Sequence, residues 1–331
     1  MSSDTLAPSS PPGATPPAPT PTGPVPKRVT VSHRLQYGAI RALIALLRLP
    51  GWRVASAVGG ALGRLARWPF GIRRGVVERH LAAAFPEWTA DTVRRTGRAA
   101  YDSLGRSFVE AAVLAGAPPA TICSIVCETE GWELLEDAIT KGGGAILMSG
   151  HLGNWELGGA YLAARGVPVA AIYRGMENPL FDAYLARTRA ELGMETIRDV
   201  TSVRRVPRAL GEGKAVAFLS DQDALGLAST FVPFFGRPAR TPRGAGVFAM
   251  RRGTPVLFAA CTRRPDGRYR FTLRPIPVVD TGDREADVDA IVLACNRTLE
   301  EEIRRVPAQY FWHHRRWKRQ PPDTPAHLRE P

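Results

Sequence analysis

Ala145-Ile146-Leu147-Met148-Ser149-Gly150-His151-Leu152-Gly153-Asn154-Trp155-Glu156 is the stretch of sequence that decides the fold. Residues 145–149 form a continuous apolar run after three glycines, which is typical of a strand covered on both faces. The residues from Trp155 onward favour a helix. His151 is therefore expected in the turn between strand and helix, at the carboxyl edge of an open α/β sheet, where ligands usually bind.

His151 and Glu156 stand at an H-x4-E spacing. An imidazole at this edge can take a proton from a hydroxyl near neutral pH, and a carboxylate one helical turn away can hold its tautomer and stabilise the imidazolium. The pattern predicts His151 and Glu156 as catalytic residues. A purely structural histidine–carboxylate pair is the alternative at this point.

The chain after Pro118-Pro119 alternates strand and helix patterns, as in an α/β domain. Strands are predicted over residues 145–149, 168–173, 215–220, 255–261 and 269–275. Helices are predicted over residues 155–165, 179–192, 203–212, 242–252 and 286–305. Helical periodicity is also expected between about residues 72 and 115.

The N-terminal part divides into two segments. Residues 1–27 are rich in proline and poor in large apolar side chains, which predicts a disordered tail. Residues 28–70 predict a membrane-associated helical segment, broken at Pro50-Gly51, whose halves are too short in apolar residues to span a bilayer. Two interfacial helices fit better, and packing on the catalytic domain is the alternative. Their arginines are expected to reach lipid headgroups: Arg41, Arg48, Arg53, Arg64 and Arg67.

The charge balance narrows the class of partner. The 331 residues contain 44 Lys plus Arg against 31 Asp plus Glu, a net charge of +13. Such an excess favours an anionic partner, although compositional bias towards arginine is an alternative. The four cysteines show no zinc spacing, and no metal or cofactor site is predicted. The polar, proline-rich start lacks the pattern of a secretory signal, which predicts the cytoplasmic side.

Two further motifs follow predicted strands. Arg174 could present a planar fork to a phosphate or carboxyl oxygen. Arg187 and Arg189 on the next helix are either substrate ligands or part of a solvated face. Asp221 and Asp223 could order a histidine, pair with Arg174, bind a divalent cation or cap the following turn.

Two aromatic segments complete the candidate residues. Phe234 and Phe235 are predicted as walls of an acyl pocket, with plain core as the alternative. Residues 307–319 mix basic and aromatic side chains that could bind nucleic acid or phospholipid headgroups. No recognised nucleic-acid fold signature accompanies them, which disfavours nucleic acid.

Together these motifs resemble the late acyltransferases of lipid A biosynthesis, the lauroyl and myristoyl transferase family. The matching elements occur in the family's order over about residues 34–320: residues 149–156, Tyr173-Arg174, Asn178-Pro179, Asp221-Gln222-Asp223, Pro233-Phe234-Phe235-Gly236, Gln309-Tyr310, Trp312 and His314-Arg315-Arg316. Gly175 departs from the pattern, because many relatives carry proline there.

The resemblance implies a fold and an activity. The fold is a central mixed, mostly parallel sheet flanked by helices, of the glycerolipid acyltransferase type, over residues 71–320, with a C-terminal tail at 321–331. The reaction is transfer of a fatty acyl group from acyl carrier protein to a hydroxyl of an anionic lipid A precursor at the cytoplasmic face of the inner membrane. Arg174, Asn154, Asn178, Asp221, Asp223 and Arg187 are expected to bind substrate.

In this interpretation His151 deprotonates the acceptor hydroxyl as it attacks the thioester, and Glu156 orients the histidine. Backbone N–H groups at Gly153 and Asn154 are expected to stabilise the oxyanion. Three alternatives stay open: acylation of another glycolipid such as a phosphatidylinositol mannoside, hydrolysis of an acyl thioester, and a non-enzymatic basic protein that binds membranes or nucleic acid.

Overall fold

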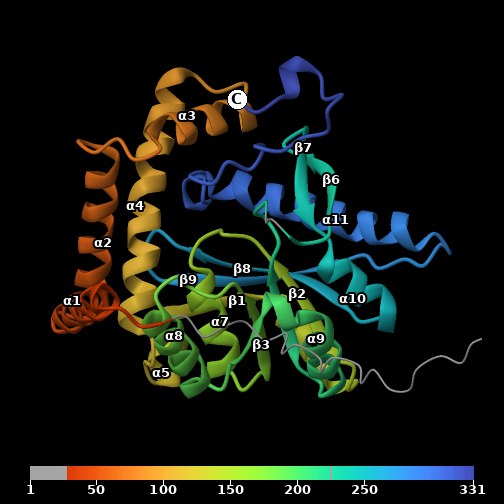
Figure 1. Ribbon diagram of the computed structural model, residues 1–331, viewed down its shortest axis with the longest axis horizontal. Helices are drawn as coiled ribbons and strands as arrows, with labels where there is room; N and C mark the ends of the chain where they lie inside the picture. The colour runs from red at the N-terminus through yellow and green to blue at the C-terminus, as the bar shows by residue number, and fades with distance from the viewer. Residues whose placement is uncertain (1–27, 224–225) are drawn as a thin grey trace, which may run out of the picture.

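The computed structural model describes residues 28–223 and 226–331, so the predicted proline-rich tail at 1–27 lies outside the described residues. A seven-stranded sheet forms the centre, in the order β1-β9-β8-β2-β5-β3-β4 (Figure 1). Only the β8–β9 pair is antiparallel, so the predicted mixed, mostly parallel sheet is confirmed. The strands are β1 (Val126–Glu130), β2 (Ala145–Ser149), β3 (Val169–Tyr173), β4 (Glu195–Arg198), β5 (Ala215–Leu219), β8 (Val256–Arg263) and β9 (Tyr269–Ile276).

The central strand β2 is covered on both faces, as its apolar run predicts. Its first four residues are buried, and their side chains alternate between two hydrophobic clusters. Ile146 and Met148 pack on one face of the sheet with residues of α10 (Gly244–Arg252) and α11 (Arg284–Arg305). Ala145 and Leu147 pack on the other face with residues of α7 (Trp155–Ala164). The strand therefore anchors the turn that carries His151 in the middle of the molecule.

Helices cover both faces of the sheet and form a separate layer at one side (Figure 1). The predicted helices all occur, with ends shifted by one or two residues. They are α1 (Val31–Arg48), α2 (Trp52–Arg67), α3 (Arg74–Ala84), α4 (Ala90–Leu114), α5 (Pro119–Ile125), α6 (Trp132–Thr140), α7 (Trp155–Ala164), α8 (Pro179–Glu191), α9 (Ser202–Gly211), α10 (Gly244–Arg252) and α11 (Arg284–Arg305).

The lateral layer is held together by close packing of α2 on α4. A Cβ atom added at Gly63 would lie 2.0 Å from the carbonyl oxygen of Tyr101, and one added at Gly105 would lie 2.1 Å from that of Gly59. Only glycine permits these backbone approaches. The long helix α4 thereby packs between α2 and α7, where the ring of its Phe108 contacts that of Trp155.

Several elements were not predicted from the sequence. Strands β1 and β4 at the two edges of the sheet and helix α6 are short, and their patterns are weak. Residues 229–242 form an antiparallel hairpin of β6 (Ser229–Phe234) and β7 (Arg237–Pro242). The alternation in β6 turns Val232 and Phe234 into the core and leaves Phe231 exposed.

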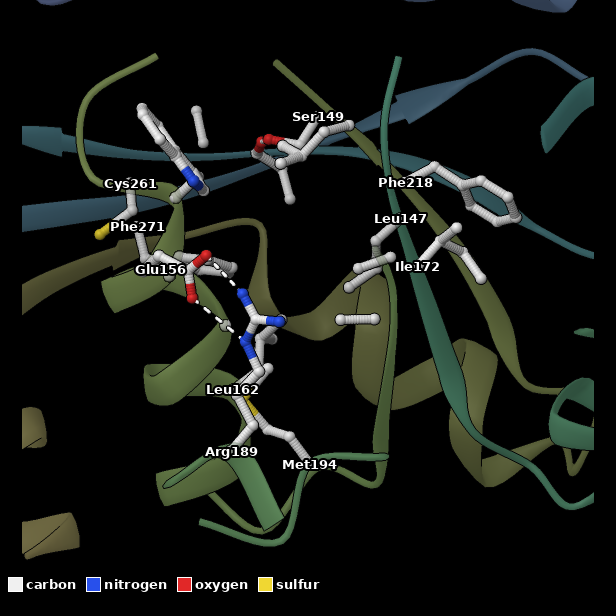
Figure 2. A pocket seen from close by; sticks show the side chains of 18 residues that line it. Leu147, Ser149, Glu156, Leu162, Ile172, Arg189, Met194, Phe218, Cys261 and Phe271 are labelled. Carbon is white, nitrogen blue, oxygen red and sulfur yellow. Dashed lines mark hydrogen bonds and ion pairs between the residues drawn. The ribbon is translucent and has the colours of Figure 1, made fainter. Parts of the chain in front are cut away.

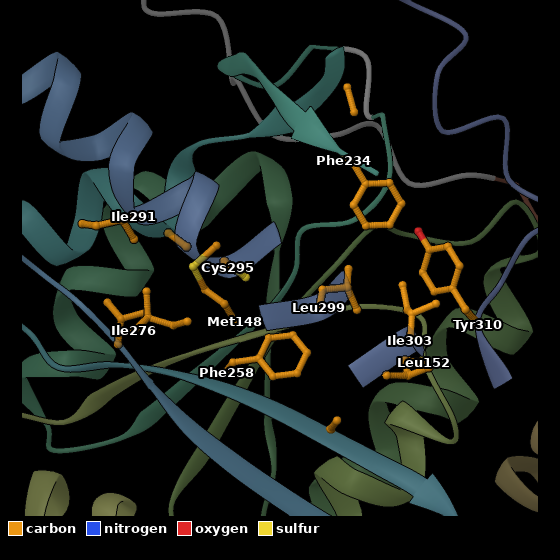
Figure 3. Packing of buried hydrophobic residues seen from close by; sticks show 14 of the residues in the cluster. Met148, Leu152, Phe234, Phe258, Ile276, Ile291, Cys295, Leu299, Ile303 and Tyr310 are labelled. Atoms are coloured by element: carbon orange, nitrogen blue, oxygen red, sulfur yellow. The ribbon is translucent and has the colours of Figure 1, made fainter. Parts of the chain in front are cut away.

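The C-terminal aromatic segment is part of the core. Trp312 and Trp317 are fully buried, and the Tyr310 ring lies against Phe234 in the cluster drawn in Figure 3. The guanidinium of Arg316 is buried as well and donates to the carbonyl of Arg240 at 2.6 Å. The interpretation of these aromatic side chains as a surface for bases or headgroups is therefore wrong.

Candidate active site

Two neighbouring parallel strands bring His151 and Asp221 together. Ser149 of β2 is in register with Leu219 of β5, and each candidate residue stands two positions beyond its strand. His151 Nδ1 lies 2.7 Å from Asp221 Oδ1, and the His151 backbone N–H donates to Oδ2 at 2.9 Å. Asp221 is almost fully buried, whereas 18% of the His151 side chain is exposed. The pair thus presents its histidine, and not its carboxylate, to a substrate.

Electrostatics favour an ionised Asp221. Burial alone would raise the pKa of this carboxyl, but the charge and hydrogen bonds of His151 outweigh it, and its pKa lies below the ordinary value. Burial likewise opposes protonation of His151, and the Asp221 carboxylate outweighs this, so the pKa of the imidazole is raised. An ionised carboxylate only accepts, so Nδ1 carries the proton and Nε2 is left as a free base.

The backbone between His151 and α7 is tied to two other segments. Gly153 has φ +65°, and a Cβ atom there would lie 2.1 Å from the Cys261 carbonyl oxygen, which makes glycine necessary. Its N–H donates to the carbonyl of Gln309 at 2.9 Å, and that of Asn154 donates to the carbonyl of Cys261 at 2.8 Å. Both groups are occupied, so the prediction that they stabilise an oxyanion is wrong.

Glu156 does not orient His151. Its carboxylate accepts two hydrogen bonds from Arg189 of α8, at 2.6 Å from Nη2 and 3.3 Å from Nε, as the dashed lines in Figure 2 mark. The orienting contact predicted for Glu156 is made by Asp221 instead. The Glu156 charge acts on His151 through space and raises its pKa less than Asp221 does. Arg189, considered above as part of a solvated face, is only 14% exposed.

An apolar pocket opens beside this turn, between α7, α8 and the sheet (Figure 2). Its volume is about 90 Å³. Its charged lining residues are Glu156 and Arg189, and its apolar walls include Leu147, Leu162, Met194, Phe218 and Phe271. The predicted walls Phe234 and Phe235 lie elsewhere, buried in the core on the other face of the sheet.

Two asparagines predicted to bind substrate cap helices instead. The buried side chain of Asn154 accepts the N–H of Leu157 at 3.1 Å at the start of α7. That of Asn178 accepts the N–H of Leu180 at 3.0 Å at the start of α8, and its amide donates to the carbonyl of His33 in α1 at 3.1 Å. Both side chains are thus engaged in hydrogen bonds within the protein.

The remaining predicted ligands are dispersed. The buried Asp223 carboxylate forms ion pairs with Arg240 and Arg319, each at 2.8 Å, so it is not available to substrate. Arg187 is exposed on α8, 3.6 Å from Glu191. Arg174 is exposed one residue beyond β3 and forms no hydrogen bond or ion pair within residues 28–223 and 226–331.

The part of the chain that the structure describes contains no cluster of three or more side chains suited to a metal ion. The His151–Asp221 pair, called the dyad below, supplies a base that solvent can reach. The apolar pocket, with Glu156 and Arg189 in its lining, opens beside it. This arrangement suits transfer of an acyl group: the pocket takes an apolar chain, and the base meets a hydroxyl.

Comparisons with known proteins agree with this chemistry. The lipid A biosynthesis palmitoleoyltransferase of Escherichia coli is 29% identical over 278 residues, 83% of this chain and 88% of the relative. The lauroyltransferase of the same organism is 27% identical over 294 residues, 88% of this chain and 94% of the relative. A phosphatidylinositol mannoside acyltransferase of Mycolicibacterium smegmatis is 26% identical over 276 residues, 80% and 87% of the two chains.

The family model described as bacterial lipid A biosynthesis acyltransferase matches residues 26–319, which include every element of the site. The chain therefore belongs to the bacterial lipid A biosynthesis acyltransferase family and is an O-acyltransferase.

Proposed function

We propose that this acyltransferase moves a fatty acyl chain from acyl carrier protein to a hydroxyl of a lipid A precursor at the cytoplasmic face of the inner membrane. The observation that carries the proposal is the His151–Asp221 dyad beside an apolar pocket. The names of the lipid A acyltransferases of Escherichia coli support the acceptor class. A net charge of +13 suits both an acidic carrier and a phosphorylated lipid.

In the proposed reaction Nε2 of neutral His151 removes the proton of the acceptor hydroxyl, and the oxygen attacks the thioester carbonyl. Asp221 holds the Nδ1–H and stabilises the imidazolium that forms. Collapse of the tetrahedral intermediate breaks the C–S bond, and His151 returns the proton to the leaving thiolate. The products are an ester and the free carrier thiol, so the dyad returns to its starting state.

The acceptor is tested by mass spectrometry of membrane glycolipids from cells with and without the gene. Loss of one acyl group from lipid A on deletion, restored by wild-type protein but not by a His151→Gln variant, is the expected result. Loss of an acyl group from a phosphatidylinositol mannoside would instead identify that glycolipid as the acceptor, as the name of the Mycolicibacterium smegmatis relative indicates for that protein. Release of free fatty acid by purified protein without any acceptor would instead indicate a thioesterase.

The pocket makes a prediction about chain length. Because the proposed acyl chain lies against the residues that line this pocket, a smaller lining side chain leaves room for a longer chain. Met194 is the flexible wall, and an added Cβ at Gly159 would lie 2.8 Å from its Cε. Met194→Ala is expected to shift preference to longer chains, by about 0.8 kcal/mol or roughly fourfold per methylene accommodated.

Competition between acyl donors of different length measures this preference. Met250→Ala is the matched control, because Met250 is half-buried on α10 and does not line the pocket. An unchanged preference in folded Met194→Ala, or an equal shift in Met250→Ala, would place the acyl chain elsewhere.

Membrane attachment through the N-terminal helices is part of the proposal. No helix in the described ranges combines the length and apolar character needed to cross a bilayer. α1 and α2 nevertheless expose many large apolar side chains: Leu35, Leu43, Leu46, Val54, Val58, Leu62, Leu65, and after α2 Trp68 and Phe70. Such a surface suits helices that lie in the plane of the interface.

Most of the arginines expected to reach headgroups are used within the protein. Arg48 donates to the carbonyls of Val113 and Ala115, at 3.0 and 2.7 Å. The buried Arg67 forms a 2.9 Å ion pair with Glu78, and Arg41 stacks on Tyr184. Arg64 forms an ion pair with Asp102. The apolar side chains, and not these arginines, therefore carry the proposed attachment.

Replacing both Leu62 and Leu65 by glutamate is expected to weaken binding to vesicles that contain anionic phospholipid. The two side chains are 47% and 50% exposed, so the fold should tolerate the change. Their loss weakens binding by about 2 kcal/mol, roughly thirtyfold. Cosedimentation with vesicles measures it, and Val279→Glu, at a 61% exposed residue outside this surface, is the control. Equal binding of the double variant and the control would refute attachment through α2.

A further inference from the structure

A buried carboxylate lies beneath the catalytic turn and takes no part in the proposed chemistry. Glu110 of α4 is fully buried, and its oxygens accept hydrogen bonds from Arg263 at the end of β8 and from the hydroxyl of Tyr269 at the start of β9. Arg263 Nη2 lies 2.7 Å from Glu110 Oε2. A third donor is the side-chain amide of Asn154, at 3.2 Å from the same oxygen. Three parts of the chain that are distant in the sequence, α4, the turn before α7 and the β8–β9 hairpin, thus meet at one charge.

Asn154 transmits this contact to the catalytic turn. While its amide nitrogen donates to Glu110, its amide oxygen accepts the N–H of Leu157 and so begins α7. A second residue of α4, Ser107, donates its hydroxyl to the carbonyl of Gly153 at 2.9 Å. Helix α4 therefore holds the two residues that separate the His151 turn from the first turn of α7.

Burying the charges of Glu110 and Arg263 costs hydration energy, which argues that the pair does more than stabilise the fold. A buried ion pair stabilises a fold little more than apolar residues of the same size would, because both charges lose their hydration. A fully satisfied buried network does, however, restrict its members to one geometry. In this protein the network includes Asn154, which lies at one end of the catalytic turn. His151 lies at the other end of the same turn and bonds to Asp221 through its backbone N–H and its Nδ1.

We propose that Glu110 is a positioning residue of the acyl-transfer site: through Asn154 it fixes the turn that carries His151 and Glu156. The inference rests on the proposed function in taking His151 as the reacting base. Glu110 itself touches no substrate. Its effect is on the distance between His151 and Asp221, and therefore on the rate of the chemical step and on the pKa of His151.

Two variants remove the network in different ways. Glu110→Gln keeps the size of the side chain and removes its charge. Asn154→Ser keeps an oxygen that can cap α7 but is too short to reach Glu110. Asp287→Asn is the matched control, because Asp287 is also a buried carboxylate and its hydrogen bonds, at 3.0 and 2.7 Å, go to Thr281, away from the catalytic turn.

Steady-state kinetics of the full-length folded variants, and titration of the His151 imidazole by NMR, give the readouts. In both network variants kcat should fall about 10- to 100-fold with the KM for the acyl donor changed by less than about twofold. The pKa of His151 should fall towards about 6.5, the ordinary value, because the Asp221 contact is loosened. Asp287→Asn should keep the wild-type kcat and the wild-type His151 pKa.

A purely structural role predicts a different result: a lower melting temperature with unchanged kcat per folded molecule and unchanged His151 pKa, and this outcome would overturn the proposal. If Glu110→Gln does not fold, Asn154→Ser alone decides. If the wild type transfers no acyl group, the proposed function fails, yet a lowered His151 pKa in the variants would still support positioning by Glu110.

Discussion

Replacing His151 by glutamine is expected to lower kcat for acyl transfer by about 10²- to 10⁴-fold without loss of the fold. Glutamine cannot accept the proton of the acceptor hydroxyl, whereas its amide can still donate to Asp221, which otherwise would be left as a buried charge with one partner fewer. His151→Ala should lose as much activity and more stability. Acyl transfer and thermal unfolding of both variants measure the two effects.

The pH dependence of the wild type and of these variants provides the control. Because the pKa of His151 is raised, stabilisation by the His151–Asp221 pair is complete below about pH 6.5, the value of the unfolded chain, and is lost as the pH rises through the raised pKa. Activity shows the opposite dependence, since the base must be neutral, and should rise through the same pKa. A folded His151→Gln variant within a few-fold of wild-type activity would remove His151 from the chemistry.

The local part of the site could be predicted from the sequence because its signals are local. A continuous apolar run fixes β2, the periodicity after Trp155 fixes α7, and His151 must then lie in the turn between them. The parallel sheet places that turn at the edge where ligands bind. No knowledge of distant residues is needed for these steps.

The partners of the site residues could not be predicted, because sheet register and helix faces decide them. Asp221 and Asp223 are two residues apart, yet one bonds to His151 and the other to Arg240 and Arg319. Only the alignment of β5 with β2 distinguishes them. Arg187 and Arg189 likewise lie about 200° apart around α8, so one is exposed and the other reaches Glu156.

The prediction of Phe234 and Phe235 as walls of an acyl pocket rested on their apolar, aromatic character alone. Phe234 and Phe235 have the apolar character of acyl-pocket walls, but the tertiary packing of the hairpin places them in the core with Trp317 and Trp312. The pocket is walled by residues of β2, β3, β5, β8, β9 and α7 and by Met194. In the sequence most of these residues look like ordinary core positions. A pocket that forms between a helix and a sheet depends on residues far apart in the chain, so it has no recognisable pattern in the sequence.

Because Asp221, and not Glu156, bonds to His151, the variants Asp221→Asn and Glu156→Gln should behave differently. In Asp221→Asn the carbonyl oxygen of the amide is expected to keep the hydrogen bond from the His151 backbone N–H, so the NH₂ group faces Nδ1. Nδ1 then has to accept, and the proton moves to Nε2, the atom that should act as the base. A fall in kcat of about 10²- to 10⁴-fold is expected.

The acid limb of the pH profile distinguishes the two carboxylates. Without the Asp221 charge the imidazolium loses its main stabilisation, so the residual activity of Asp221→Asn should show its acid limb at lower pH than the wild type. Glu156→Gln keeps an acceptor for Arg189 and removes only a weak, through-space contribution to the His151 pKa, so its acid limb should stay at the wild-type pH even where kcat falls. A shift in Glu156→Gln as large as that in Asp221→Asn would show that Glu156 tunes His151 as strongly as Asp221 does, and would refute the assignment of Asp221 as the one carboxylate that orients the base.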